Sequence, residues 1–143
     1  DCLKIVPSHL AALLDSEQAT LPLTLILGGE PIPATLIERI ARLRSDCRVF
    51  NHYGPTEATV GVMIHPLSLH GAAGDCAALT QVLGNNQVYL LDADLRLAPV
   101  GVLGEVYLGG AQLCRGYLHA EADEQTFIQS PFDPAQRLYR TGD

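Results

Sequence analysis

The residues best suited to chemistry lie together between positions 51 and 57. The segment reads Asn-His-Tyr-Gly-Pro-Thr-Glu, so an amide, an aromatic ring, a hydroxyl and a carboxylate surround a tight Gly-Pro turn. Each would have a use at a nucleotide: Tyr53 offers a ring face to a purine, Thr56 a donor to a phosphate, and Glu57 a hard oxygen ligand to Mg²⁺. The simpler alternative is a turn in which Thr56 caps a short helix.

This segment should follow a strand of a parallel sheet, because strands and helices alternate through the first half of the chain. The predicted elements are a strand over 3–6, a helix beginning at 7, a strand over 23–27, a helix over 33–44, and strands over 48–51 and 60–64. A βαβαβ order implies right-handed crossovers, and ligands of such sheets bind beyond the carboxyl ends of the strands. We therefore expect residues 4–7, 28–30 and 51–57 to converge.

Both helices are predicted to bury an apolar face against this sheet. The first face consists of Leu10, Leu13 and Leu14. The second consists of Leu36, Ile37, Ile40 and Leu43. On the second helix Glu38 and Arg42 are spaced as an i,i+4 ion pair.

The second half of the chain is richer in strands. The predicted elements are a surface loop over 67–78, strands over 88–91, 105–108 and 138–140, and a short helix over 121–128. The expected organisation is therefore an α/β part over 1–66, the loop, and a β-rich part over 79–143.

Composition limits the class of protein. With 143 residues, 48% hydrophobic and 17% charged, the chain suits a folded globular protein. Its net charge of −7 argues against nucleic acid as a partner, since phosphate binding needs clustered Lys and Arg. No apolar run approaches the roughly 18 residues of a membrane span, and cytoplasm is the expected compartment. The widely spaced Cys2, Cys47, Cys76 and Cys114 are expected to be reduced core thiols.

Four segments resemble, in order, the adenylation domains of nonribosomal peptide synthetases. They are Gly-Gly-Glu at 28–30, Asn-x-Tyr-Gly-Pro-Thr-Glu at 51–57, Gly-Glu-Val-Tyr-Leu-Gly-Gly at 104–110 with Arg-Gly-Tyr at 115–117, and Tyr-Arg-Thr-Gly-Asp at 139–143. One departure is Leu-Thr-Gln-Val at 79–82, where the family usually carries an Ile-Gly-Arg-Pro-like turn. The resemblance implies part of the large N-terminal core of an adenylate-forming, AMP-binding enzyme: a partial parallel-sheet α/β layer followed by a β-rich, distorted barrel-like subdomain.

The resemblance also implies roles for individual residues. Asn51 and Tyr53 would hold the adenine, Thr56 would contact the α-phosphate, and Glu57 would ligate Mg²⁺. Asp143 would accept both ribose hydroxyls. The turn beneath the adenine would consist of Gly28, Gly29 and Glu30. The glycine-rich segment is interpreted as structural.

A substrate also follows from the resemblance. In the family, the side-chain pocket is lined by positions that match Lys4, Ile26, Gly28, His52, Val60 and Gly61. A lysine and a histidine in a mostly apolar pocket are costly unless an anion neutralises them. The set resembles that of aspartate-activating domains, so L-aspartate is expected, with asparagine as the near alternative. The simpler alternative is that Lys4 is a solvated strand-end residue and His52 a hydrogen-bonded turn histidine.

The implied reaction joins an amino acid and ATP to give aminoacyl-AMP and pyrophosphate. The acyl group would then pass to the phosphopantetheine thiol of a carrier domain, with condensation and other synthetase domains as partners. The resemblance implies that the phosphate loop and the aspartate that binds the α-amino group precede these residues, and that the catalytic lysine follows them. The 143-residue chain alone is therefore expected to be inactive.

Three other functions remain open from the sequence. The nearest is an acyl-CoA or aryl-acid ligase of the same fold, whose pocket would be apolar or aromatic where Lys4 and His52 stand. The second is a catalytically silent nucleotide-binding module. The third is an α/β domain that binds other proteins.

Overall fold

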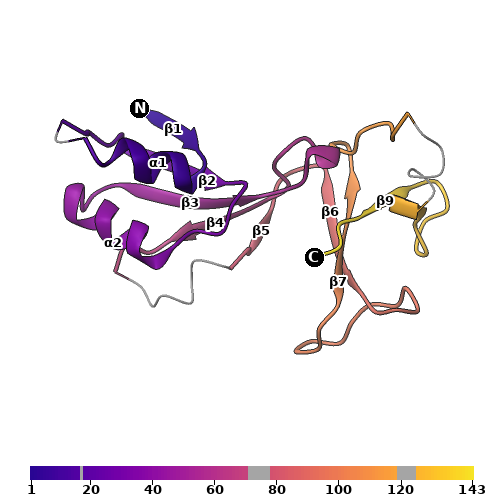
Figure 1. The fold of residues 1–143 in the computed structure, drawn as a ribbon. Helices are drawn as coiled ribbons and strands as arrows, with labels where there is room; N and C mark the ends of the chain where they lie inside the picture. Colours follow the sequence, from indigo (N-terminus) through magenta and orange to yellow (C-terminus); the bar gives the residue numbers. More distant parts are fainter. Residues whose placement is uncertain (17, 71–77, 119–124) are drawn as a thin grey trace. The chain divides into compact units, whose positions relative to one another are not determined.

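The chain divides into two compact units (Figure 1). The computed structural model describes residues 1–16, 18–70, 78–118 and 125–143. The first unit consists of Asp1–Tyr53 and Met63–Gln81, and the second of Gly54–Val62 and Val82–Asp143. The segment 54–62 thus belongs by its contacts to the second unit, although it connects two strands of the first.

The first unit is built on a mixed sheet with the strand order β1-β2-β3-β4-β5. The strands are β1 (Cys2–Ile5), β2 (Thr24–Gly28), β3 (Arg48–Tyr53), β4 (Met63–Leu67) and β5 (Gln81–Val82). Strands β1, β2 and β3 are parallel, which confirms the predicted βαβαβ order. Strand β4 runs antiparallel to β3.

The predicted strand over 60–64 is wrong at its start, because the observed strand β4 covers Met63–Leu67. A short 3₁₀ turn covers Thr56–Ala58, and Thr59 and Val60 follow it with φ angles of 56° and 68°. That left-handed backbone cannot form an extended strand. The strand therefore begins at Met63, after the chain has turned back on itself.

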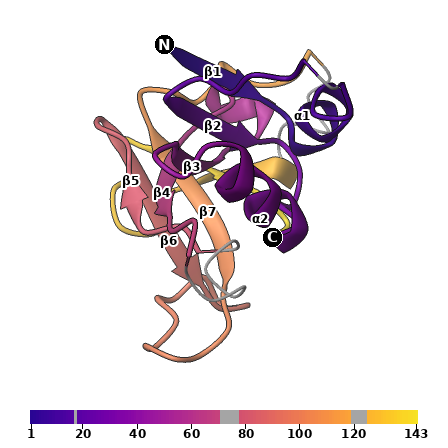
Figure 2. The same ribbon diagram turned by 90° about the vertical axis from the view of Figure 1, so that its left-hand side faces the viewer.

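Both helices pack on one face of the sheet (Figure 2). Helix α1 (Pro7–Leu13) and helix α2 (Ala34–Leu43) contribute to the same core as Leu25, Leu27 and Val49 of the strands. The predicted apolar faces were too wide, because Leu13 is 49% exposed and Leu43 is 52% exposed. Each lies at the last position of its helix, whereas Leu14, which follows Leu13, is only 5% exposed and belongs to the core.

The predicted ion pair on α2 is present, with 3.4 Å between Arg42 Nη2 and Glu38 Oε2. Both side chains are well exposed, so the pair contributes little to stability.

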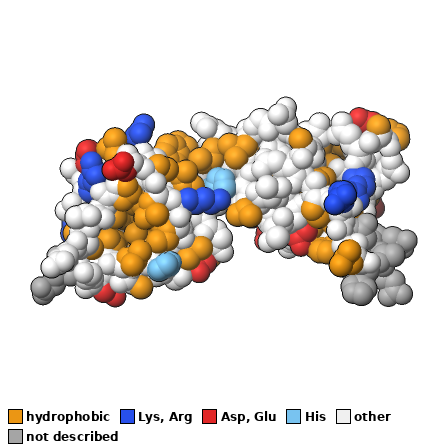
Figure 3. Space-filling view, turned by 90° about the horizontal axis from the view of Figure 1, so that it is seen from above, with side chains coloured by type: hydrophobic (Ala, Val, Ile, Leu, Met, Phe, Trp, Pro, Cys, Tyr) orange, Lys and Arg blue, Asp and Glu red, His pale blue; other side chains and the backbone are white. Residues whose placement is uncertain are grey.

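Figure 3 shows hydrophobic side chains gathered over part of the surface of the first unit. The exposed large hydrophobic residues of this unit include Leu3, Val6, Leu13 and Leu23.

The second unit contains an antiparallel sheet with the order β6-β7-β9-β8. Its strands are β6 (Asn86–Leu91), β7 (Glu105–Gly110), β8 (Phe127–Gln129) and β9 (Arg137–Arg140). The three strands predicted in this half are confirmed, and with them the α/β-then-β-rich fold class.

The predicted helix over 121–128 is wrong at its end, and its residues 121–124 lie outside the described ranges. Phe127 begins strand β8 and pairs with Tyr139 of β9. The two rings are 5.2 Å apart between centroids. This pairing crosses a turn, so the local pattern of apolar residues could not indicate it.

The cysteine prediction is confirmed in part. Cys2, Cys47 and Cys114 are free thiols, whereas Cys76 lies outside the described residues. Cys47 is buried, but Cys2 is exposed, so the expectation of a core position is wrong for Cys2. Within the described ranges, no helix combines the length and apolar character that crossing a membrane requires.

Gly110 should be essential to the second sheet. Its φ is +109°, and an added Cβ would lie 2.3 Å from the carbonyl oxygen of Asn85. Gly110→Ala should therefore lower the free energy of unfolding by about 2 kcal/mol or more. Gly84→Ala is the control, because a Cβ there meets nothing within 4 Å. Thermal unfolding followed by circular dichroism measures both, and equal melting temperatures for the two variants would contradict the prediction.

Candidate functional site

One face of the first sheet carries four of the six predicted substrate residues. Lys4 is paired with Ile26 across β1 and β2, and Gly28 with His52 across β2 and β3. Side chains two residues apart in a strand share a face. Lys4, Ile26, Gly28 and His52 therefore lie on the face opposite the buried Leu25 and Leu27. That is the face that α1 and α2 leave uncovered.

A close approach of two strands explains why position 28 is a glycine. A Cβ on Gly28 would lie 2.2 Å from the carbonyl oxygen of His52, a distance that no side chain can tolerate. Gly29 follows with a φ of +84° and turns the chain away from the sheet.

Lys4 and His52 share an electrostatic environment. Partial burial lowers the pKa of His52, and the positive charge of Lys4 lowers that pKa further. The imidazole is therefore held neutral at pH 7. A bound anion between the two side chains would reverse the second effect.

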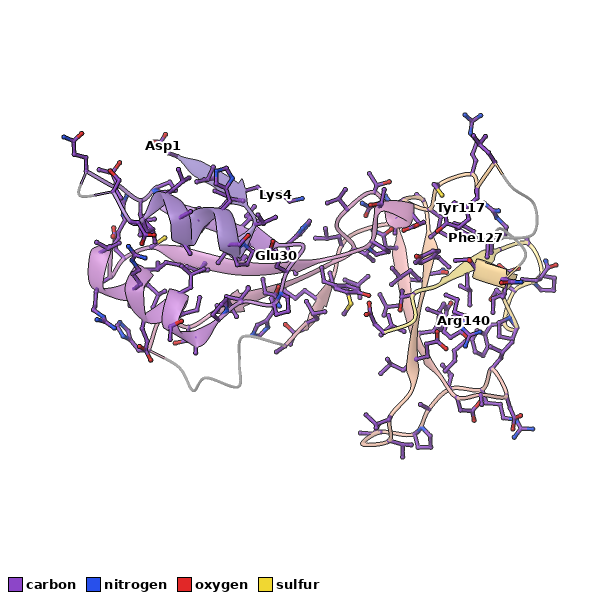
Figure 4. All side chains as sticks on the ribbon, viewed as in Figure 1. Asp1, Lys4, Glu30, Tyr117, Phe127 and Arg140 are labelled. Carbon is purple, nitrogen blue, oxygen red and sulfur yellow. The ribbon has the colours of Figure 1, made fainter. Side chains whose placement is uncertain are left out.

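Glu30 has a structural partner. Its carboxylate accepts hydrogen bonds from the backbone N–H of Ser8 at 3.0 Å and from the hydroxyl of Ser8 at 2.9 Å. These bonds tie the turn after β2 to the start of α1. Figure 4 shows Lys4 and Glu30 near the carboxyl ends of β1 and β2, as the alternation of strands and helices predicts.

The two residues expected to hold adenine end β3. Asn51 is half-buried, and its amide donates to the carbonyl of Ala78 at 3.4 Å. Tyr53 is also half-buried and is the last residue of the strand. Their side chains point to the opposite face from His52, because residues alternate along a strand.

Four further predicted site residues lie on the segment 54–62 of the second unit, here called the carboxylate loop. They are Thr56, Glu57, Val60 and Gly61. A Cβ on Gly54 would lie 2.9 Å from the Cα of Gly61 and 2.8 Å from the backbone nitrogen of Val62, so the loop doubles back tightly. Thr56 and Val60 are exposed, Glu57 is half-buried and Gly61 is buried.

Glu57 is held as a carboxylate. The hydroxyl of Tyr117 donates a hydrogen bond to Oε1 of Glu57. This bond lowers the pKa of Glu57, Tyr139 lowers it less, and partial burial opposes both. The pKa of Tyr117 is raised by the same hydrogen bond, so the phenol stays a donor.

An ionised carboxylate of this kind fits Mg²⁺. The described part of the chain holds no group of three or more His, Cys, Asp or Glu that could bind a metal ion. Mg²⁺ commonly takes one or two carboxylates and completes its shell with phosphate oxygens and water. Glu57 fits that pattern, with a nucleotide supplying the other ligands.

Asp143 is positioned by an ion pair close to it in the sheet. Arg140 donates through Nε and Nη2 to the two oxygens of Glu105 at 2.8 to 3.0 Å. Glu105 also accepts the backbone N–H of Gly142 at 3.2 Å. The carbonyl of Asp143 accepts from the backbone of Val106 at 3.0 Å. Asp143 is exposed and borders an open groove of about 910 Å³ in the second unit.

Sequence reasoning missed Tyr117 and the Glu105–Arg140 pair as parts of this site. Tyr117 lies 60 residues after Glu57, inside a segment interpreted as structural. Glu105 and Arg140 are 35 residues apart. Arg140 and Tyr117 both lie within recognisable motifs, but no local pattern indicates which carboxylates they contact.

These features agree with comparisons to known proteins. The AMP-binding enzyme family model matches residues 1–118, and the chain belongs to that family. Among curated proteins, surfactin synthase subunit 1 of Bacillus subtilis is 40% identical over 96% of this chain and 4% of its own length. Tyrocidine synthase 3 of Brevibacillus parabrevis is 35% identical over 99% of this chain and 2% of its own length. The chain therefore spans a small part of each relative.

A solved structure extends the likeness to three dimensions. A four-domain nonribosomal peptide synthetase, solved with AMP and glycine bound, is 36% identical and covers the whole chain with a TM-score of 0.83. This chain spans 11% of that protein. The sequence resemblance to nonribosomal peptide synthetases is thus confirmed.

His52 should respond to the charge at position 4. Lys4→Met should raise the pKa of His52, because one of the two effects that lower it is removed. The pKa should still lie below the ordinary value of 6.5, since burial remains. Histidine NMR signals followed through a pH titration measure this shift. Arg42→Met, on the exposed side of α2, is the control and should leave the pKa unchanged.

The same shift has a consequence for stability. Because the folded pKa of His52 lies below its unfolded value, the folded state binds fewer protons. The free energy of unfolding therefore does not suffer from protonation of His52 well above pH 6.5. It decreases as the pH falls from 6.5 through the folded pKa, because the unfolded state takes up the proton first. An unchanged pKa in Lys4→Met would contradict the proximity of the two charges.

Proposed function

We propose that the protein containing this chain activates an amino acid with ATP as aminoacyl-AMP, releasing pyrophosphate. The acyl group would then be loaded onto the phosphopantetheine thiol of a carrier domain. The observation that carries the proposal is the ordered set of four motifs on a chain of the AMP-binding enzyme family. The relatives named surfactin synthase and tyrocidine synthase support it, as does the nonribosomal peptide synthetase structure with AMP and glycine bound.

In this proposal the residue roles are those that the motif resemblance implies, taken residue by residue. In the first unit, Asn51 and Tyr53 contact the adenine, and the turn Gly28-Gly29-Glu30 lies beneath it. In the second unit, Thr56 contacts the α-phosphate and Asp143 the ribose hydroxyls. A bound Mg²⁺ would supply positive charge to the phosphates, and Glu57 is the residue that would hold it.

We propose an acidic amino acid, L-aspartate, as the substrate. Lys4 and His52 share one face of the sheet with the apolar Ile26 and with Gly28. Two basic groups placed in this way favour an anion, because the positive charge of the exposed Lys4 disfavours protonation of the half-buried His52. The β-carboxylate of aspartate would satisfy both. The resemblance also assigns Val60 and Gly61 of the carboxylate loop to substrate binding.

The alternative of an acyl-CoA or aryl-acid ligase is less favoured. Such an enzyme would bind an apolar or aromatic acid, for which a lysine on the sheet face has no use. A silent nucleotide-binding module would keep the fold without turnover. Amino-acid-dependent exchange of labelled pyrophosphate into ATP by the full-length protein separates both alternatives from the proposal.

The partners in the proposal are a carrier domain and other synthetase domains, and the proposed compartment is the cytoplasm.

Substrate choice should depend on Lys4. In a panel of amino acids, the full-length protein should prefer aspartate over asparagine by about tenfold or more in kcat/KM. Lys4→Met should remove this preference, because the partner of the β-carboxylate is lost. Arg48→Met is the control: it removes a cation from the same sheet face at the other end of the strands. Preference of the unmodified protein for an apolar amino acid would end the aspartate proposal.

Nucleotide affinity should depend on Asp143. Asp143→Ala should raise the KM for ATP about tenfold or more, because hydrogen bonds to a charged group are lost. The KM for the amino acid should change little. Asp94→Ala, which removes an exposed carboxylate from the same unit, is the control. Unchanged ATP kinetics in Asp143→Ala would show that the ribose assignment is wrong.

A further inference from the structure

The carboxylate loop is held by residues 112–117, here called the clamp segment, which follows β7. The backbone carbonyl of Glu57 accepts the N–H of Cys114 at 2.7 Å. The hydroxyl of Thr59 donates to the carbonyl of Gln112 at 2.7 Å. The side-chain amide of Gln112 donates to the carbonyl of Gly61 at 2.9 Å. The loop is therefore fixed by three contacts along its length.

The end of the clamp segment is fixed by an aromatic cluster. The ring of Tyr117 packs edge-on against Phe127, with 5.7 Å between centroids (Figure 4). The guanidinium of Arg137 lies 5.1 Å from the centre of the Phe127 ring. Arg137 also donates to the carbonyls of Cys114 and Arg115 at 3.1 and 3.2 Å. The position of the Tyr117 hydroxyl is thus determined by strands β8 and β9.

We propose that Tyr117 is a positioning residue for Glu57. Its hydroxyl holds Oε1 of the carboxylate and so fixes the direction in which the group presents its other lone pairs to a metal-bound nucleotide. A carboxylate fixed in this way loses little side-chain entropy when it binds Mg²⁺. Hydrogen-bonded partners of this type orient metal-ligating carboxylates in proteins generally. The inference rests on the proposed function, because that function provides the Mg²⁺ and ATP.

The hydroxyl of Tyr117 is not needed to fill space. The residue is 40% exposed, and its packing on Phe127 involves the ring alone. Phenylalanine at this position would keep the ring contact and lose the interactions of the hydroxyl with Glu57 and with Tyr139. A substitution can therefore remove the positioning effect while leaving the cluster packed.

The test is Tyr117→Phe in the full-length protein, with calorimetric binding of ATP measured in Mg²⁺ and in EDTA. We expect the affinity for ATP in Mg²⁺ to fall about tenfold, the range typical of lost partners of a metal ligand. The affinity for metal-free ATP and the KM for the amino acid should not change. The Mg²⁺ concentration for half-maximal pyrophosphate exchange should rise by a similar factor.

Tyr89→Phe is the matched control, because the hydroxyl of Tyr89 donates to Gln87 at 3.4 Å and its ring stacks on Phe132. This variant should bind ATP like the unmodified protein. A double-mutant cycle then separates positioning from direct contact with ATP. If Tyr117 acts through Glu57, Tyr117→Phe should add little to the loss of Mg²⁺-dependent binding already caused by Glu57→Gln.

Two results would overturn the inference. One is unchanged Mg²⁺-dependent ATP binding in Tyr117→Phe. The other is a loss of that binding on Tyr117→Phe that is equally large in the unmodified protein and in Glu57→Gln. A lower melting temperature with equal losses in every kinetic constant would assign Tyr117 a purely structural role, which also contradicts it. Absence of any amino-acid-dependent exchange in the unmodified protein would overturn the proposed function itself. An active protein in which Tyr117→Phe behaves like Tyr89→Phe would overturn this inference alone.

Discussion

The packing of both helices against a single face of the parallel strands determines what the first unit can bind. Leu25, Leu27 and Val49 fill that face and are almost fully buried. Because successive side chains of a strand point to opposite faces, burial of this set commits Lys4 and His52 to the other face. A shift of one residue in register would exchange the two sets. The chemistry of the open face is therefore a consequence of the core.

The second unit carries its acidic site residues on irregular backbone, which regular secondary structure does not hold in place. The carboxylate loop has two left-handed residues and no regular structure beyond a 3₁₀ turn, so the clamp segment supplies its order. Asp143 follows the end of β9, where Glu105 and Arg140 fix the backbone of the preceding residues. Exposed ion pairs contribute little to stability, but a pair held by two hydrogen bonds fixes the relative orientation of its two side chains. These contacts therefore orient the acidic residues rather than stabilise the fold.

The elements that carry strong periodicity could be predicted from the sequence. Strands β1 to β3 and both helices followed from apolar runs and stripes, and with them the convergence of residues 4–7 and 28–30. Strand β4 was predicted to begin too early, and the start of β8 was predicted as the end of a helix, because the left-handed residues near Val60 and the pairing of Phe127 with Tyr139 depend on tertiary contacts. Candidate residues were found from types and motifs. The partners that orient them, such as Tyr117, are distant in sequence and carry no local signal.

The central claim is that Lys4 and His52 recognise an acidic side chain. The most direct test is a crystal structure of the full-length protein with a non-hydrolysable aspartyl-adenylate analogue. We expect the β-carboxylate to lie about 3 Å from both Lys4 Nζ and a ring nitrogen of His52. A β-carboxylate bound elsewhere, with Lys4 directed into solvent, would contradict the claim.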